Sequence, residues 1–134
     1  MDWKKYGLAT LAFVISGFVI AVIWHFALFG QTYRDLHMYT REPVIALGFI
    51  SFILEGLAFV YIFQLFRNGK EPVREGLVFG LLVYGVLMGG VGVLAEGAKY
   101  ASTSLLTWIL VEGAFYLVAG ALIGPLVSLI YSRK

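Results

Sequence analysis

The stretch EGLVFGLLVYGVLMGGVGVLAEGA, residues 75–98, decides the fold that this sequence predicts. It is long enough for the roughly 20 residues that a membrane-spanning helix needs, and its only charged residues are Glu75 and Glu96, near its two ends. Three further stretches share this length and apolar character, at residues 7–30, 44–66 and 104–131. Together they predict an all-α, four-helix transmembrane bundle that forms a single domain over residues 1–134.

The composition places the bundle in a lipid bilayer. Hydrophobic residues make up 60% of the 134-residue chain, charged residues make up 13%, and the mean hydropathy is +0.88. A water-soluble domain of this size could not cover so much apolar surface. The absence of cysteine excludes disulfides, thiolate metal sites and a cysteine nucleophile. No complete catalytic or cofactor motif occurs, which favours a non-enzymatic protein and leaves the question of an enzyme open. No basic face occurs, so no nucleic-acid partner is expected.

The connections predict how the bundle is oriented. Segments 31–43, 67–74 and 99–103 are too short for extramembrane domains, which favours antiparallel neighbouring helices. Seven basic residues lie on one side of the predicted bundle: Lys4, Lys5, Arg67, Lys70, Arg74, Arg133 and Lys134. Three lie on the other: Arg34, Arg41 and Lys99. Because cytoplasmic loops carry the excess of Lys and Arg, both termini are predicted in the cytoplasm, and the membrane is predicted to be a prokaryotic inner membrane.

Aromatic and turn residues mark the ends of the predicted spans. Seven aromatic side chains near these ends are predicted to form interfacial belts: Trp3, Tyr6, Tyr33, Tyr39, Tyr100, Trp108 and Tyr131. Segment 31–43 mixes both charge signs with aromatics, which indicates a short helix lying at the interface. In the turn RNGKEP, residues 67–72, Gly69 is predicted to adopt a left-handed conformation at the helix stop.

Four ionisable residues each lie inside a different apolar stretch: His25, Glu55, Glu96 and Glu112. A charged side chain within a bilayer costs roughly 2.5–3.5 kcal/mol on the most lenient scale, so it needs a partner, a proton, a bound cation or water. These residues are therefore the candidate site.

Small residues predict which helix faces meet. Gly85, Gly89, Gly92 and Glu96 follow helical spacing, so the glutamate shares a face with a glycine groove that another helix can approach closely. Gly120 and Gly124 mark a second small-residue face, which favours a homodimer or docking in a larger membrane complex.

The positions of the four ionisable residues along their helices predict two layers. Glu55 and Glu112 form the deeper layer, and His25 and Glu96 the shallower one, although a boundary error of two residues would merge them. The segments FILEG, residues 52–56, and WILVEG, residues 108–113, resemble each other, and a duplicated hairpin would bring Glu55 and Glu112 together. Two carboxyls close together in a low dielectric cannot both ionise cheaply, so one keeps a proton or a cation sits between them.

Structural explanations compete with a binding site. Each deep acid also has a structural explanation, a proton and a hydrogen bond to Ser51, Tyr116 or a backbone carbonyl that would hold helices together, although two buried acids are hard to justify by packing alone. Glu96 lies three residues before Lys99, and a local ion pair at the interface would explain it. His25 beside Trp24 is explained by packing alone.

Three functional hypotheses follow. The leading one is a binding or transport module in which Glu55 and Glu112 accept a proton, a metal ion or an organic cation. The second is a non-catalytic accessory subunit that docks a larger membrane complex through its small-residue faces. The third is an intramembrane metalloenzyme with His25, Glu55, Glu96 and Glu112 as ligands, although the Glu-x-x-His pairs of di-iron bundles are absent.

The sequence IWHFALFGQTY, residues 23–33, resembles a known pattern when it is taken with EGL at residues 75–77 and the aromatic fourth stretch. It resembles small bacterial four-helix membrane proteins, which form a family described only as a domain of unknown function. Those proteins carry a Trp, then Leu-Phe-Gly and another aromatic, at the end of their first helix. The resemblance implies the four-helix architecture and no activity. The chain is also similar in size and helix number to small multidrug transporters, which place their essential glutamate on the first helix, where this sequence has His25.

Overall fold

The computed structural model describes residues 2–37, 44–99 and 102–133. All the regular secondary structure in these residues is helical. Four helices are long and apolar enough to cross a membrane: Trp3–Leu28, Ile45–Phe66, Pro72–Lys99 and Leu105–Ser132. The predicted all-α class and the four predicted stretches are therefore confirmed, with ends that differ from the prediction by a few residues.

The first span changes its helix type before it ends. Helix α1, Trp3–Val22, begins at Asp2, whose side chain accepts a hydrogen bond from the Lys5 backbone N–H and so satisfies one of the free donors of the first turn. The helix continues as the π-helix η1, Ile23–Leu28. The chain bends at Phe29 and forms α2, Gly30–Leu36. This confirms the predicted short helix in its first part, while residues 38–43 lie outside the described residues.

The second and third spans are joined by a tight turn. Helix α3, Ile45–Phe66, ends at Arg67, and Gly69 has the predicted positive φ of 76°. The Glu75 carboxylate accepts backbone N–H groups of this turn, at 3.0 Å from both Gly69 and Lys70. The third span then runs as α4, Pro72–Phe79, the π-helix η2, Gly80–Gly90, and α5, Val91–Lys99.

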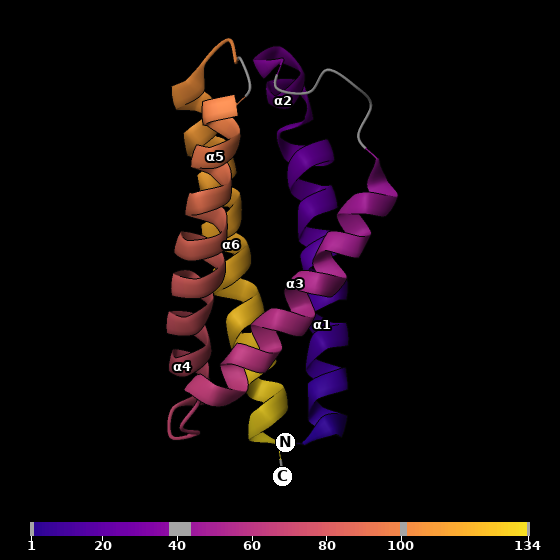
Figure 1. Ribbon diagram of the computed structural model, residues 1–134, viewed down its shortest axis with the longest axis vertical. Helices are drawn as coiled ribbons and strands as arrows, with labels where there is room; N and C mark the ends of the chain where they lie inside the picture. The colour runs from indigo at the N-terminus through magenta and orange to yellow at the C-terminus, as the bar shows by residue number, and fades with distance from the viewer. Residues whose placement is uncertain (1, 38–43, 100–101, 134) are drawn as a thin grey trace.

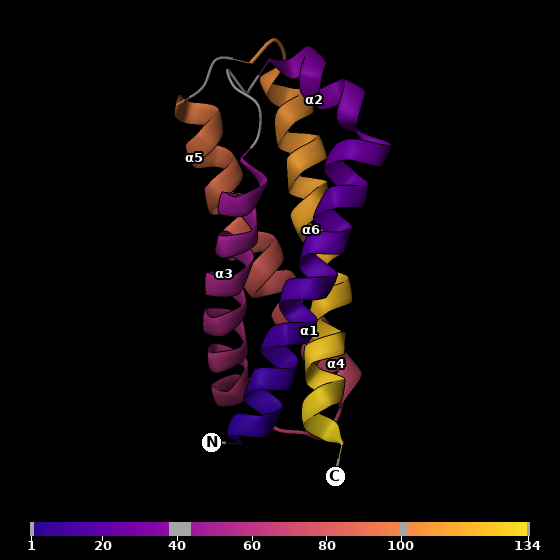
Figure 2. The same ribbon diagram turned by 90° about the vertical axis from the view of Figure 1, so that its right-hand side faces the viewer.

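The fourth span is the continuous helix α6, Leu105–Ser132, which contains Pro125. Ser104 caps its first turn by accepting a hydrogen bond from the Thr107 backbone N–H. Helix α6 contacts α1, α4, η2 and α5, whereas α3 packs mainly against α1 (Figures 1 and 2). Both ends of the chain lie at the same end of the molecule, next to the α3–α4 turn.

Four glycines allow α4 and η2 to touch α6 backbone to backbone. A Cβ added to Gly80 would overlap the Gly120 carbonyl oxygen, and one added to Gly124 would lie 2.9 Å from the Gly80 Cα. A Cβ added to Gly76 would lie 2.6 Å from the Pro125 Cα. Such close approach gives dispersion contacts that hold helices together where lipid provides no hydrophobic drive.

This glycine contact removes the basis for one prediction. Gly120 and Gly124 were predicted to offer a face to a second copy or a larger complex, but α4 and η2 of the same chain cover them. A homodimer or a larger complex stays a prediction without that support.

The other predicted glycine face is only partly correct. Gly85 approaches Leu117 and Gly89 abuts Tyr116, both on α6, whereas a Cβ at Gly92 would meet nothing within 4 Å. The α-helical spacing fails here because η2 has i→i+5 hydrogen bonds and therefore more residues per turn than an α-helix.

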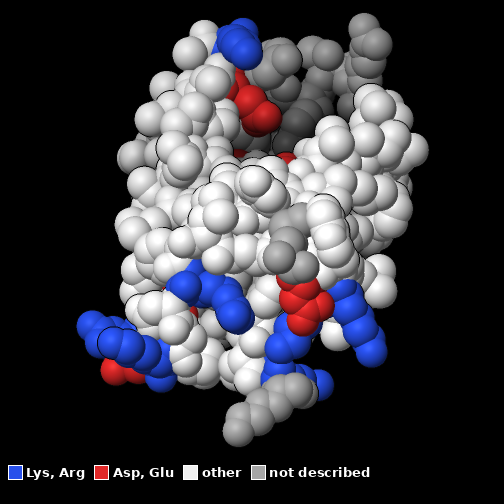
Figure 3. Space-filling view, turned by 60° about the horizontal axis from the view of Figure 1, so that its bottom comes forward, with Lys and Arg blue, Asp and Glu red and all other residues white. Residues whose placement is uncertain are grey.

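The outer surface of the spans is apolar. Leu47, Leu65 and Leu106 are 64%, 74% and 68% exposed, and many other aliphatic side chains on all four spans are exposed as well. A continuous surface of this kind is unstable in water and is typical of contact with lipid. Lys and Arg side chains instead gather at the end that holds the two termini (Figure 3).

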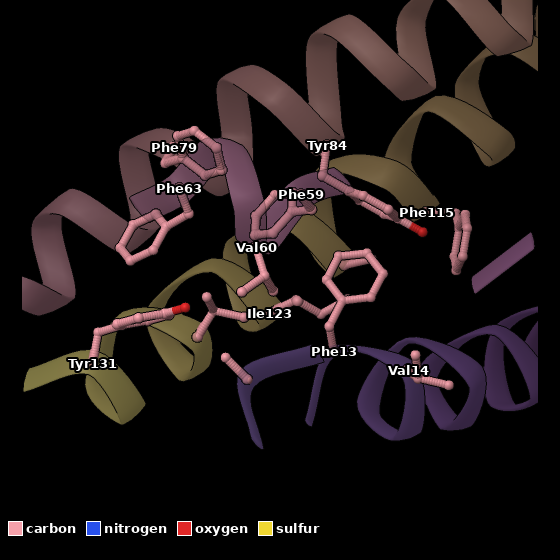
Figure 4. Close-up of a cluster of buried hydrophobic side chains, with 13 residues drawn as sticks. Phe13, Val14, Phe59, Val60, Phe63, Phe79, Tyr84, Phe115, Ile123 and Tyr131 are labelled. Atoms are coloured by element: carbon pink, nitrogen blue, oxygen red, sulfur yellow. The ribbon is translucent and has the colours of Figure 1, made fainter. Parts of the chain in front are cut away.

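The interior is mainly aromatic (Figure 4). The Phe59 ring lies 5.1 Å from Phe13 and 4.8 Å from Phe79, centroid to centroid, and Tyr84 packs on Phe13 at 5.5 Å. These rings come from α1, α3, α4 and η2, and the same cluster includes Phe115 of α6, so it connects all four spans. It positions Tyr84, whose hydroxyl is polar, in the centre of the molecule.

The predicted aromatic belts are wrong for three residues. Tyr33, Trp108 and Tyr131 are 6%, 0% and 5% exposed, so they are packed inside the protein and do not face lipid. Trp3, which is 69% exposed, fits the prediction. Tyr39 and Tyr100 lie outside the described residues.

Candidate functional site

The most buried ionisable group of the four is Glu112 on α6, which is 6% exposed. Its carboxyl group lies 3.3 and 3.4 Å from the Nε2 atom of His25 on η1. The Tyr33 hydroxyl on α2 donates a hydrogen bond to Oε2 of the same carboxyl. We call His25, Tyr33 and Glu112 the polar triad.

Hydrogen bonding fixes where the imidazole proton of the triad lies. The Nδ1 atom of His25 is 2.9 Å from the Ala21 carbonyl oxygen, which can only accept, so Nδ1 carries a hydrogen. If Nε2 carries a second hydrogen, His25 is a cation that faces a carboxylate. If it does not, Nε2 is an acceptor and Glu112 must be protonated to bond it. In both cases one proton lies between His25 and Glu112.

Aromatic rings enclose the triad. The His25 ring lies 4.8 Å from Tyr33 and 4.7 Å from Phe115, and the Tyr33 ring meets Trp108 at 6.2 Å. The Trp108 indole N–H donates to the Val93 carbonyl oxygen at 3.3 Å, which joins α6 to α5. This packing buries the Glu112 carboxyl and leaves His25 partly buried, and the lower polarity around the pair strengthens the electrostatic interaction between imidazole and carboxyl.

The short helix α2 covers the triad and is fixed at its far end. The Ser102 hydroxyl and the Thr103 backbone N–H both donate to the Leu36 carbonyl oxygen, each at 3.2 Å. The Thr103 hydroxyl donates to the Asp35 carbonyl oxygen at 2.8 Å. Tyr33 is therefore brought onto Glu112 by the bend at Phe29 and by these bonds to the α5–α6 connection.

Glu55 belongs to a separate hydrogen-bonded group. The Ser51 hydroxyl, one turn earlier on α3, donates to Glu55 Oε1 at 2.8 Å, as predicted. The Tyr84 side chain on η2 lies within interaction range of the same carboxyl. Glu55 is half-buried. Among the described residues it forms no ion pair with a Lys, Arg or His.

The predicted direct pairing of Glu55 with Glu112 is wrong. No hydrogen bond joins them in the described part of the chain, and each has its own partners. Tyr84 lies within electrostatic range of both carboxyls, and its ring packs 5.4 Å from the predicted site residue Tyr116.

The predicted pairing of His25 with Glu96 is also wrong, since His25 contacts Glu112. Glu96 is exposed on α5 but lies within electrostatic range of Glu112, His25 and Lys99. The predicted ion pair between Glu96 and Lys99 does not form among the described residues. His25 and Glu112 were predicted in two different layers, which a small boundary error would merge. The structure brings these two residues into contact, so the layers do merge there.

The four ionisable residues do not gather as a metal-binding set. Within residues 2–37, 44–99 and 102–133, no three His, Asp or Glu side chains are placed to hold one ion. His25 and Glu112 belong to the triad, Glu55 lies in its own group, and Glu96 is exposed. This arrangement gives no support to the intramembrane metalloenzyme hypothesis.

Sequence reasoning missed Tyr33 and Tyr84 as site residues. Tyr33 was assigned to the aromatic belt, and its role depends on the bend at Phe29, which has no clear sequence signal. Tyr84 did have a signal, because a phenol hydroxyl in the middle of an apolar span needs a hydrogen-bond partner.

No family model, no curated protein and no solved structure matches this chain. The resemblance to small bacterial four-helix membrane proteins of unknown function therefore stays a prediction, and the site must be interpreted from its own chemistry.

Proposed function

We propose that the protein is an integral membrane module that binds or transports an organic cation in exchange for a proton held by the polar triad. The observation that carries this proposal is the contact of the buried Glu112 carboxyl with the His25 imidazole, a hydrogen bond that a proton on either group would form. A buried ionisable pair in a membrane span typically marks a proton or ion pathway. The proposed location is a prokaryotic inner membrane.

The proposed topology is an antiparallel four-span bundle with both termini in the cytoplasm. Its support is the excess of basic residues at the end that holds the termini, because cytoplasmic loops retain Lys and Arg (Figure 3). The triad would then lie towards the outer side, beside α2.

A cysteine-labelling experiment tests this topology. The chain has no cysteine, so Lys70→Cys and Asp35→Cys each create a single thiol on opposite ends of the molecule. In intact cells we expect a membrane-impermeant maleimide to label residue 35 and to leave residue 70 unlabelled until the cells are opened. Labelling of residue 70 alone in intact cells would reverse the topology.

The two acidic groups differ in a way that suggests separate roles. Glu112 already has a basic partner in His25, whereas within the described residues Glu55 pairs with no cation and accepts a hydrogen bond from the Ser51 hydroxyl. A cation could therefore bind the Glu55 carboxyl without competition from a positive side chain among the described residues. The Tyr84 ring lies beside this carboxyl, and aromatic rings attract cations. Acidic side chains are also visible on the surface away from the end where most Lys and Arg gather (Figure 3).

Exchange follows from electrostatics. Tyr84 interacts with both carboxyls, so a positive charge at Glu55 acts on the proton of the triad through a low-dielectric interior. Loss of that proton leaves a negative carboxylate that the cation stabilises. The proton and the cation therefore compete, which is the thermodynamic requirement for coupled transport.

Binding of tetraphenylphosphonium, a lipophilic organic cation, to the protein in lipid nanodiscs tests the proposal. If binding releases one proton, affinity should rise about tenfold from pH 6 to pH 7, because the two ligands are linked. Glu112→Gln should bind without this pH dependence, and Glu55→Gln should bind at least about tenfold more weakly. Calorimetry in two buffers of different ionisation enthalpy measures the released proton.

Glu71→Gln serves as the control, because Glu71 is exposed in the α3–α4 turn and pairs only with Arg74. It should bind as the wild type does. Binding that is equal at the two pH values in the wild type, with no proton released, would refute exchange. In that case co-purification of a stoichiometric membrane partner would favour the accessory-subunit alternative.

A further inference from the structure

A second polar site lies at the opposite end of the bundle from the triad. A cavity of about 450 Å³ opens there between the start of α1 and the ends of α3 and α6. Its lining residues are Asp2, Lys5, Tyr61, Gln64, Leu65, Arg67 and Tyr131. We call it the terminal cavity. None of these residues belongs to the site described above.

Two cationic side chains of the terminal cavity converge on one atom. Lys5 Nζ lies 3.3 Å and Arg67 Nη1 lies 3.2 Å from the Tyr131 carbonyl oxygen near the end of α6, and Lys5 Nζ also donates to the Arg133 carbonyl oxygen. The carbonyl groups at a helix C-terminus carry only a partial negative charge. Neither cation forms an ion pair among the described residues. Two positive charges held this close favour an anion that bridges them.

The Arg67 guanidinium is already positioned for such an anion. It stacks over the Tyr131 ring at 4.9 Å, and the structure gives it one hydrogen bond, from Nη1. Because a guanidinium has five N–H donors in a fixed plane, its remaining edge suits the oxygens of a phosphate.

Unsatisfied polar atoms provide an independent indication of a ligand. The Gln64 Nε2 and the Tyr131 hydroxyl are buried and have no hydrogen-bond partner among the described residues. Tyr131 is only 5% exposed. Buried donors without partners are costly, and a polar cavity of this size has room for a group that accepts from them.

We propose that the terminal cavity binds the phosphate of an anionic phospholipid headgroup, with Lys5 and Arg67 as its charged partners and Gln64 as a neutral donor. A lipid is favoured over a free phosphate because the cavity lies where three apolar spans end. Its rim carries Tyr61 and Leu65, which are 50% and 74% exposed and suit acyl chains. Basic pockets between helices at this level are typical of headgroup recognition.

Lipid binding to the full chain in detergent, measured by native mass spectrometry, tests the proposal. Phosphatidylglycerol should bind about tenfold more tightly than phosphatidylcholine, whose choline offsets the phosphate charge. The double variant Lys5→Gln, Arg67→Gln should lose this preference. Gln64→Leu should bind phosphatidylglycerol several-fold more weakly without loss of thermal stability in lipid-free detergent, since it removes an unsatisfied donor.

Arg74→Gln is the matched control, because Arg74 is a cation at the same end that does not line the terminal cavity. It should keep the wild-type preference for phosphatidylglycerol. Equal binding of the two lipids by the wild type, or the same loss in Arg74→Gln, would overturn the proposal. Competition by millimolar inorganic phosphate that removes the bound lipid would assign the site to free phosphate instead.

Discussion

Replacing Gly80 by alanine is expected to destabilise the protein by about 3 kcal/mol, although alanine is the better helix former. The added methyl would overlap the Gly120 carbonyl oxygen and lie 3.0 Å from the Gly124 Cα, and neither backbone can move without separating η2 from α6. Overpacking typically costs about 1–3 kcal/mol, and a clash with backbone belongs at the upper end of that range. Unfolding in mixed micelles, followed by circular dichroism, measures the loss.

Gly92→Ala is the matched control in the same span. A Cβ at Gly92 would meet nothing within 4 Å, so only helix propensity changes, and we expect a gain of up to about 1 kcal/mol. The two substitutions are chemically identical and are predicted to have opposite signs. Equal stability of the two variants would show that α4, η2 and α6 do not pack through their glycines.

Replacing Glu112 by alanine should have the second large effect. The Tyr33 hydroxyl loses its acceptor and the His25 Nε2 its carboxyl partner, in a place that water does not reach readily. Buried groups left without partners cost about 1–3 kcal/mol. We also expect α2 to exchange its amide hydrogens faster, because Tyr33 no longer holds it on α6. Hydrogen exchange with mass spectrometry locates that change.

Two comparisons separate this effect from a general loss of packing. Glu112→Gln keeps an acceptor for Tyr33 and should retain most of the stability, while Glu96→Ala, at an exposed position, should cost no more than about 0.5 kcal/mol. A double-mutant cycle between Glu112→Ala and Tyr33→Phe should give a coupling of at least about 0.5 kcal/mol. Additive effects would mean that the hydrogen bond contributes nothing to stability.

The spans could be predicted from the sequence because they depend on a one-dimensional property. About 20 apolar residues in a row are enough to cross a membrane, whatever the neighbouring helices do. The turn at Gly69 and the bond from Ser51 to Glu55 are equally local, since each joins residues a few positions apart. The predictions confirmed by the structure are of this kind.

The partners of the ionisable groups could not be predicted in the same way. His25 lies in η1 and Tyr84 in η2, so the direction of each side chain depends on a helix type that hydropathy does not reveal. Depth along an ideal α-helix then gives the wrong neighbour, and His25 meets Glu112 in place of Glu96. Tyr33 reaches Glu112 only because α2 folds back, which is a long-range effect.

The two π-helical segments also have an evolutionary consequence. A π turn holds one residue more than an α turn, so a single-codon deletion within residues 23–28 would let this short segment close as an α-helix while the flanking turns keep their facing directions. The segment Gly80–Gly90 spans more than one π turn, so one deletion there would narrow only part of it. Such deletions would change the side chains next to His25 or Tyr84 and leave the ends of each span in place. An alignment with a chain that lacks one of these residues would therefore place its gap inside a helix and not in a connection.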